Sequence, residues 1–252
     1  MTTDSGYADV NGVHMYYETY GEGTPLVLLH GGMLSIDLNF AGLIPTLARK
    51  HRVIGVEMQG HGRTADTGRA ITPAALAADV VGLLDHLGID RAHVLGHSMG
   101  GAVTMELAVS HPDRVRSVVP ISVSVRPDGM HPDLADPSKF ATSPIMPTQQ
   151  DFQDFAAEYK RLSPHPDHFD EFLAMLSASN ADLKGWTDEQ LAAITAPVLL
   201  VLGDRDFTTN EHAALMQQLI PGSQLAILPN TTHMQVTRRA DLLLPMLDDF
   251  LG

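Results

Sequence analysis

Short apolar runs alternate with amphipathic stretches along most of the chain. Two runs near the start, at 8–10 and 13–17, flank Asn11-Gly12, a pair typical of a two-residue hairpin turn. Later runs are apolar without alternation, which is typical of strands buried on both faces. These runs predict six further strands, at 25–29, 52–56, 92–95, 117–122, 197–202 and 224–228.

Helical periodicity fills most of the intervals between these runs. Apolar residues recur at helical spacing from Leu76 to Leu87, after a Thr72-Pro73 pair that supplies an N-cap and a first-turn proline. Further helices are predicted at 38–49, 99–110, 213–219 and 240–251. The alternation of strand and helix predicts an α/β fold: a mostly parallel, eight-stranded sheet with helices on both faces.

The alternation of predicted strands and helices is interrupted between residues 126 and 195. Five prolines between positions 127 and 147 predict loops, because helix and strand interiors do not tolerate proline. Helical patterns return at about 152–162, 169–178 and 188–194, and aromatic residues such as Phe155 and Trp186 weigh against a disordered linker. We therefore predict a core domain formed by 1–125 and 196–252, with a small helical cap inserted at 126–195.

Composition and charge narrow the classes of partner. The chain has 252 residues, 44% hydrophobic and 18% charged, as in a globular domain that buries a sizeable core. A net charge of −14 disfavours nucleic acid and anionic membranes as partners. The absence of cysteine excludes a disulfide scaffold, a thiolate metal site and a cysteine nucleophile. With neither a signal-peptide pattern nor an apolar run of about 20 residues, we expect a cytoplasmic protein; the sequence does not indicate its oligomeric state.

Residues 96–100, Gly-His-Ser-Met-Gly, match the pattern G-x-S-x-G between a predicted buried strand and a predicted helix. A serine at such a corner occupies a strained turn, and small neighbours two positions away let strand and helix approach. Ser98 is therefore predicted to be a nucleophile. The alternative is an ordinary helix N-cap serine.

A serine hydroxyl needs a base to take its proton, and in this architecture an acid and then a histidine follow the serine along the chain. Among 13 histidines, His233 follows the last predicted strand, at the sheet edge where α/β proteins place their chemistry. Asp204 and Asp206 both follow the preceding strand. Residues two apart in an extended segment point the same way, so the pattern leaves both aspartates as candidates.

His30-Gly31-Gly32 ends the first long buried strand, where small residues free backbone N–H groups to face a substrate oxygen. We predict the N–H groups of Gly32 and Met99 as the two donors of an oxyanion hole. Met33 and Met234 lie beside these segments and predict an adaptable, apolar substrate pocket; the alternative is that these methionines fill the core. This set of residues requires no metal and no organic cofactor.

Five segments resemble, in order and spacing, those of the bacterial single-domain α/β-hydrolases, a group of carboxylesterases, lactonases, carbon–carbon bond hydrolases and proline iminopeptidases. The resemblance implies the α/β-hydrolase fold and places the acid at the fourth residue of the G-x-x-D segment, which is Asp206. Glu57 stands where many members carry aspartate, and we expect it to affect loop packing rather than chemistry. The segments are His30-Gly31-Gly32, Gly60-His61-Gly62-Arg63-Thr64, Gly96-His97-Ser98-Met99-Gly100-Gly101, Gly203-Asp204-Arg205-Asp206 and Thr232-His233.

These features predict hydrolysis of a small carboxylic ester or lactone through an acyl-enzyme on Ser98. A carbon–carbon bond hydrolase or an aminopeptidase would keep the same three residues, and acidic cap residues could hold the amine of a peptide. A non-hydrolytic, ligand-binding member of the fold is the alternative from a different class, and turnover of a generic aryl ester separates it from an enzyme. The acidic cap residues are Glu158, Asp167, Asp170 and Glu171.

Overall fold

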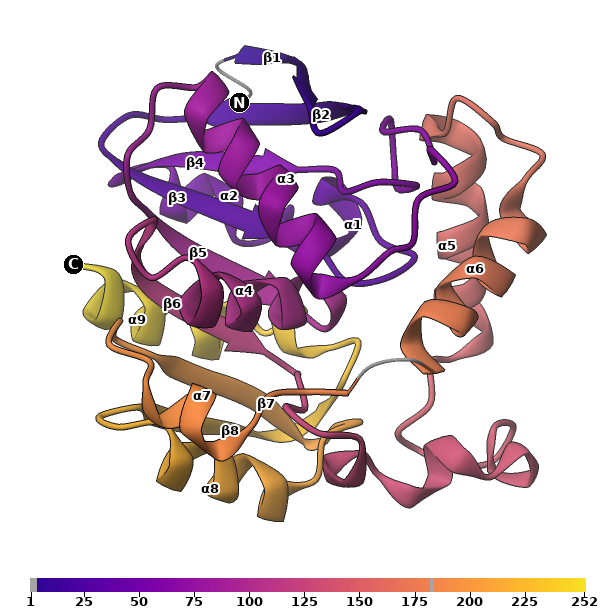
Figure 1. Cartoon of the computed structure of the whole chain (residues 1–252). Helices are drawn as coiled ribbons and strands as arrows, with labels where there is room; N and C mark the ends of the chain where they lie inside the picture. The colour runs from indigo at the N-terminus through magenta and orange to yellow at the C-terminus, as the bar shows by residue number, and fades with distance from the viewer. Residues whose placement is uncertain (1–3, 182–183) are drawn as a thin grey trace.

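A single eight-stranded sheet runs through the computed structural model, which describes residues 4–181 and 184–252 (Figure 1). Its strand order is β1-β2-β4-β3-β5-β6-β7-β8. The first two pairings, β1 with β2 and β2 with β4, are antiparallel, and all later neighbours are parallel. The predicted mostly parallel sheet is confirmed. Its strands are β1 (Asp4–Val10), β2 (Val13–Tyr20), β3 (Thr24–Leu29), β4 (His51–Val56), β5 (Ala92–His97), β6 (Val115–Ile121), β7 (Leu199–Arg205) and β8 (Gln224–Thr232).

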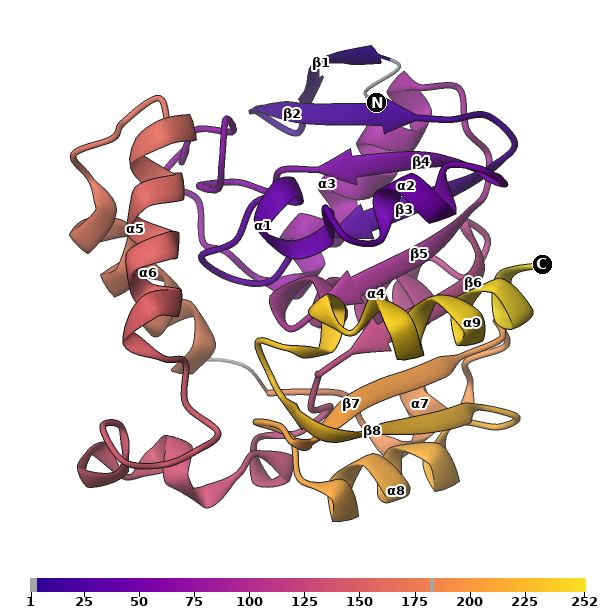
Figure 2. The same ribbon diagram turned by 180° about the vertical axis from the view of Figure 1, so that it is seen from behind.

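Helices cover both faces of the sheet (Figure 2). Successive side chains of a strand point to opposite faces, so β3 supplies Val27 to one core and Leu28 to the other. This explains why the predicted strands are apolar without alternation. One face carries α3 (Pro73–His86), α4 (Met99–Ser110), α7 (Asp188–Ala192) and α8 (Asn210–Leu219); the other carries α1 (Ile36–Phe40), α2 (Ile44–Leu47) and α9 (Ala240–Leu251).

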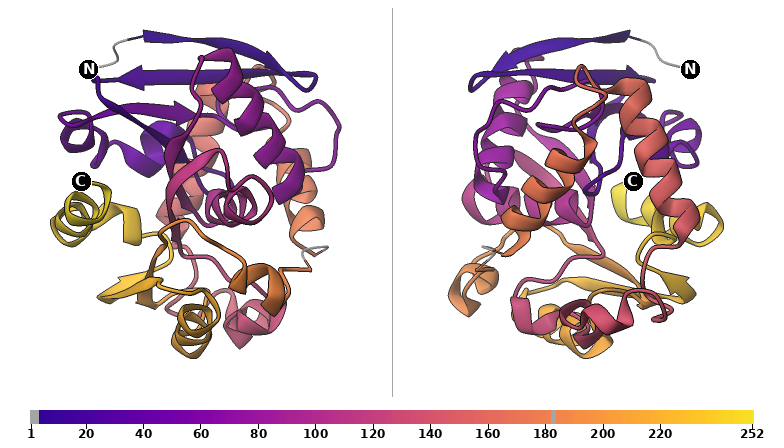
Figure 3. Two further views of the ribbon diagram at one scale, coloured as in Figure 1. Left: turned by 60° about the vertical axis from the view of Figure 1, so that its left-hand side comes forward. Right: turned by 90° about the vertical axis from the view of Figure 1, so that its right-hand side faces the viewer.

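Two helices of the inserted segment stand beyond the carboxyl ends of the parallel strands: α5 (Gln149–Leu162) and α6 (Phe169–Ala181) (Figures 1 and 3). The prolines before them begin short 3₁₀ turns at Pro127–Gly129, Pro132–Ala135 and Pro137–Lys139, where the missing N–H costs nothing. The next helix, α7, contacts α8 of the core. The predicted extent of the cap, 126–195, stays a prediction.

Several element boundaries differ from those predicted. The single helix predicted at 38–49 is two short helices, because Pro45 has no N–H with which to continue a helix from Ala41. Strand β7 continues to Arg205 and β8 to Thr232, where the two residues still pair. Asp206 and His233 therefore follow directly after neighbouring strands. Within the described ranges, no helix is long and apolar enough to cross a membrane.

Candidate active site

Ser98 occupies the turn between β5 and α4 with φ 53° and ψ −112°, a strained conformation for a residue with a side chain. Small neighbours make this turn possible. A Cβ on Gly96 would lie 2.1 Å from the carbonyl oxygen of Gly100, and one on Gly100 would lie 2.0 Å from that of Leu29. The N–H of Ser98 donates to the carbonyl of Ile121 at 2.8 Å. Ser98 is half-buried at the carboxyl edge of the sheet.

The structure brings Ser98, His233 and Asp206 together in one hydrogen-bonded chain. The Oγ of Ser98 lies 2.9 Å from Nε2 of His233, and Nδ1 of His233 lies 2.6 Å from Oδ1 of Asp206. Both contacts are satisfied when Nδ1 carries the proton: Nδ1–H donates to the carboxylate, and Nε2 accepts from the serine hydroxyl. This tautomer leaves His233 ready to take the proton of Ser98.

The carboxylate of Asp206 is buried, and each of its oxygens has two donors. Oδ1 accepts from Nδ1–H of His233 and from the N–H of Phe207, both at 2.6 Å. Oδ2 accepts from the hydroxyl of Ser122 at 2.6 Å and from the N–H of Gly203 at 3.1 Å. Burial alone would raise the pKa of Asp206, but the nearby His233 and these donors hold it below its usual range. The carboxylate of Asp206 is therefore charged at neutral pH, next to the imidazole of His233.

Asp204, the other candidate acid, points toward β8 and not toward His233. Its exposed carboxylate accepts from the N–H groups of Asn230 at 2.8 Å and Thr231 at 2.9 Å. These two hydrogen bonds lower the pKa of Asp204. The structure thus places Asp206 beside the histidine, while Asp204 ties the end of β7 to the segment that precedes His233.

Two aromatic rings outside the chain of three hold His233 in place. The ring of Phe207 stacks on the imidazole, with centroids 3.8 Å apart and planes 12° apart. On the other side, Nε2–H of His97 donates to the carbonyl of His233 at 3.0 Å. His97 is fully buried, and burial together with the neighbouring His233 lowers its pKa to about 3. Its ring is therefore neutral, and its Nδ1 has no hydrogen-bond partner among the described residues.

Met99, one of the two predicted oxyanion donors, follows Ser98 directly, and Gly32, the other, follows Gly31, where an added Cβ would lie 3.4 Å from Cβ of Ser98. Met99 is the first residue of α4, so its N–H has no acceptor within the helix and lies at the positive end of the helix dipole. Within the described ranges, neither this N–H nor that of Gly32 donates to a backbone or side-chain acceptor. The imidazole of His30 instead supports the loop, since it contacts the carbonyl of Gly31 at 2.8 Å and accepts the N–H of Met58 at 3.1 Å.

The cap helices pack directly on these segments. Phe172 and Leu176 of α6 belong to the buried cluster against which Met33 packs. A Cδ1 atom of Leu176 lies 3.9 Å from the position that a Cβ on Gly32 would take. Met234 is buried beside Phe155 of α5. The structure thus places both predicted pocket methionines against the cap, and their contact with substrate stays a prediction.

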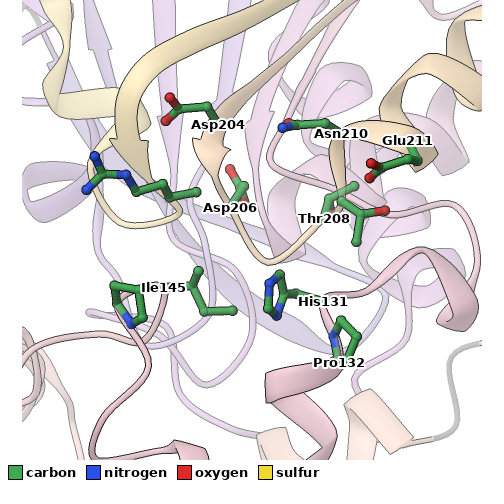
Figure 4. A pocket seen from close by; sticks show the side chains of 11 residues that line it. His131, Pro132, Ile145, Asp204, Asp206, Thr208, Asn210 and Glu211 are labelled. Atoms are coloured by element: carbon green, nitrogen blue, oxygen red, sulfur yellow. The ribbon is translucent and has the colours of Figure 1, made fainter.

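A cavity of about 420 Å³ borders Asp206 (Figure 4). Asp204, Asp206, His131 and Ile145 are among the residues that line it, whereas Ser98 is not. The cavity therefore borders Asp206 but not Ser98. Neither here nor elsewhere in the described chain do three or more His, Asp or Glu side chains form a group that could hold a metal ion.

Glu57 packs within a loop, as the sequence predicts. Its buried carboxylate accepts the N–H of Arg63 at 2.6 Å and pairs with Nη1 of the same residue at 2.8 Å. Burial raises the pKa of Glu57 to about 7, against the opposing effect of the Arg63 hydrogen bonds and charge. The contact fastens the Gly60–Thr64 loop, which lies under α6 where Phe172 meets Gly60.

Residues 24–180 match the family model described as the alpha/beta hydrolase fold. This chain belongs to that family. It is 30% identical to the putative carbamate hydrolase RutD of Azorhizobium caulinodans, over 98% of each chain. It is 26% identical to a 2-hydroxy-6-oxo-6-phenylhexa-2,4-dienoate hydrolase of Burkholderia cepacia, over 92% of this chain and 89% of the relative. The crystal structure of the enol-lactonase from Burkholderia xenovorans superposes with a TM-score of 0.72 at 25% identity, covering 97% of this chain and 99% of that one.

These α/β-hydrolases are named for a carbamate, a dienoate and an enol-lactone, so family membership alone does not identify the substrate.

Three residues that support the site were not predicted from the sequence: His97, Ser122 and Phe207. Their contacts join strand ends that are distant in the chain, with His97 and His233 separated by 136 positions and Ser122 and Asp206 by 84. The one available signal was the place of His97 inside the serine motif.

Proposed function

We propose that this α/β-hydrolase cleaves a small carboxylic ester or lactone through an acyl-enzyme on Ser98. One observation carries the proposal: Ser98, His233 and Asp206 form a continuous hydrogen-bonded chain. The unpaired N–H groups of Gly32 and Met99 beside it supply what a tetrahedral intermediate needs. The three relatives described above carry the names of hydrolytic enzymes, which supports this chemistry.

The proposed reaction follows from the protonation states at the site. Oγ of Ser98 attacks the substrate carbonyl while Nε2 of His233 takes its proton, and Asp206 stabilises the imidazolium. The developing oxyanion accepts from the N–H groups of Gly32 and Met99. His233 then gives its proton to the leaving alkoxide, which in a lactone stays tethered to the acyl group. Water, deprotonated by His233, finally releases the carboxylic acid and restores the serine.

The charged residues of the cap favour an ester or lactone over a peptide with a free amine. Of the four candidate carboxylates Glu158 is the half-buried one, and it already accepts the hydroxyl of Ser35 at 2.7 Å and pairs with Arg161 at 2.7 Å. The other three candidate carboxylates of the cap are exposed at its surface. A substrate amine would have to break the Glu158 contacts, whereas a neutral ester would not.

A substrate panel tests the proposal: a nitrophenyl ester, an aliphatic lactone, a carbamate, an amide and a 2-hydroxy-6-oxo-dienoate. We expect the ester and the lactone to give the highest kcat/KM, and Ser98→Ala to abolish both activities while the far-UV circular dichroism stays unchanged. A dienoate hydrolysed far faster than any ester would support carbon–carbon bond cleavage instead. Binding of these compounds without turnover would support the ligand-binding alternative.

A further inference from the structure

Ser122, directly after β6, is a second serine at the site and lies outside the hydrogen-bonded chain of three. Its backbone has φ 55°, in the left-handed region that residues with a side chain rarely adopt. The residue is only 3% exposed. Strain of this kind persists only where the surroundings hold it, and it is concentrated at functional sites. This strained conformation places the hydroxyl of Ser122 against the carboxylate of Asp206.

The hydroxyl of Ser122 donates to Oδ2 of Asp206 at 2.6 Å, shorter than the 3.1 Å contact from the N–H of Gly203 to the same oxygen. A hydrogen bond to a carboxylate is about twice as strong as one between neutral groups. The two oxygens of a carboxylate are rigidly linked, so a donor that holds Oδ2 also sets the direction of Oδ1. Oδ1 is the atom that meets Nδ1 of His233 at 2.6 Å.

The same short segment also supports the nucleophile. The carbonyl of Ile121 accepts the N–H of Ser98 at 2.8 Å, and the N–H of Ser122 donates to the carbonyl of Val201 at 2.8 Å. Strand β6 pairs with β7 through Ile121 and Val201. The end of β6 thus holds the serine turn through its backbone and the acid through a side chain.

We propose that Ser122 is a positioning residue that acts through Asp206: its hydroxyl fixes the plane of the carboxylate and keeps Oδ1 directed at His233. The hydroxyl of Ser122 donates to Asp206 and not to Ser98 or His233. The proposal rests on the proposed function, in which the Asp206–His233 pair supports proton transfer. It predicts that loss of the hydroxyl slows catalysis without weakening substrate binding.

Two substitutions separate the hydroxyl from the backbone strain. Ser122→Ala and Ser122→Gly both remove the hydrogen bond, but glycine adopts a positive φ freely whereas alanine keeps the strain. We expect both to lower kcat for a nitrophenyl ester about tenfold with little change in KM, as befits loss of one hydrogen bond to a charged group. Ser124→Ala is the matched control, because that hydroxyl donates to the carbonyl of Arg126 and not to the acid. It should retain wild-type kcat.

The proton on Nδ1 of His233 gives a readout that needs no substrate. Its short hydrogen bond to a carboxylate should place this proton far downfield in the ¹H NMR spectrum of the wild type. In Ser122→Ala and Ser122→Gly we expect it to move upfield or broaden, while Ser124→Ala leaves it in place. If Ser122→Ala does not fold, the glycine variant carries both measurements.

The outcomes distinguish this proposal from the proposed function. Wild-type kcat in both folded Ser122 variants, or a fall in kcat with the downfield proton unmoved, would overturn positioning through Asp206. If the wild type hydrolyses neither the ester nor the lactone of the substrate panel, the proposed function fails. The NMR comparison then still decides whether Ser122 sets the Asp206–His233 hydrogen bond.

Discussion

Asp206→Asn is the substitution that probes the acid of the site most sharply, since it preserves shape and removes charge. The carboxylate accepts four hydrogen bonds, two on each oxygen. An amide offers one accepting oxygen and one donating NH₂ group. If the NH₂ faces Gly203, it opposes an N–H donor. If it faces Phe207 and His233, it opposes another N–H and forces the imidazole into the tautomer that cannot accept the proton of Ser98.

The expected loss of kcat in Asp206→Asn follows from the wrong tautomer of His233 and from the missing charge. Loss of the correct tautomer and of the charge beside the imidazolium lowers kcat by about 10⁴-fold in a comparable Ser-His-Asp site. That corresponds to ~5 kcal/mol of transition-state stabilisation. Asp204→Asn is the matched control, with the same chemical change two residues earlier. It disturbs hydrogen bonds to Asn230 and Thr231 at an exposed position, so we expect a cost of ~1 kcal/mol in unfolding free energy and a kcat within a few-fold of wild type.

Steady-state hydrolysis of a nitrophenyl ester and urea unfolding, measured on both variants, provide the assay. The expected ranking is a large loss of kcat with Asp206→Asn and a small loss with Asp204→Asn. The opposite ranking would exchange the roles of the two aspartates. Equal, small effects would show that no carboxylate supports His233.

Three further predictions concern the turn, the buried histidines and the pocket. Gly100→Ala should destabilise the fold by ~3 kcal/mol or more and abolish activity, because its Cβ would lie 2.0 Å from the carbonyl oxygen of Leu29. The control is Gly42→Ala, which has no atom within 4 Å of the new Cβ and should leave the free energy of urea unfolding almost unchanged. Burial lowers the pKa of His61 to about 4 and that of His97 to about 3. Below pH 6.5 these two histidines therefore become protonated in the unfolded chain but stay neutral in the folded protein. The free energy of unfolding should then decrease by ~1.4 kcal/mol per pH unit for each of these histidines as the pH falls to about 4. His61→Asn should reduce the slope of unfolding free energy against pH by the equivalent of one proton. An unchanged slope would contradict this. For nitrophenyl esters of increasing acyl length, kcat/KM should peak at short to medium chains with modest steps of ~1 kcal/mol per methylene; a maximum at long chains with activation at an oil–water interface would show that the pocket was misinterpreted.

The sequence predicted the sheet well because its signal is local. Runs such as 25–29 are apolar at every position, and the structure buries Val27 on one face and Leu28 on the other. Local chemistry also explains the clearest error, at 38–49, where the apolar spacing outweighed the proline at position 45. Boundaries of strands β7 and β8 were set by pairing between them, which no single segment reveals.

The part of the candidate site that lies in sequence motifs at strand ends could be predicted from the sequence. The serine corner and the histidine after the last strand follow from position relative to strand ends, and the structure brings the two side chains together. The two N–H donors stay a prediction. Alternation did not separate Asp204 from Asp206, because it assumes that both lie in one extended segment. In the structure β7 ends at Arg205, so Asp206 leaves the strand geometry and turns to the histidine. The cap's contacts with Gly32 and Gly60 depend on long-range packing, and no local pattern encodes them.

Labelling with a fluorophosphonate probe tests the central claim, that Ser98 is the nucleophile, most directly. The probe reacts with a serine only where a base and an oxyanion hole activate it. Peptide mapping by mass spectrometry should find one equivalent of label, on Ser98, with loss of ester hydrolysis in proportion, and folded Ser98→Ala should take up none. Label on another residue, or ester hydrolysis that survives in Ser98→Ala, would contradict the assignment.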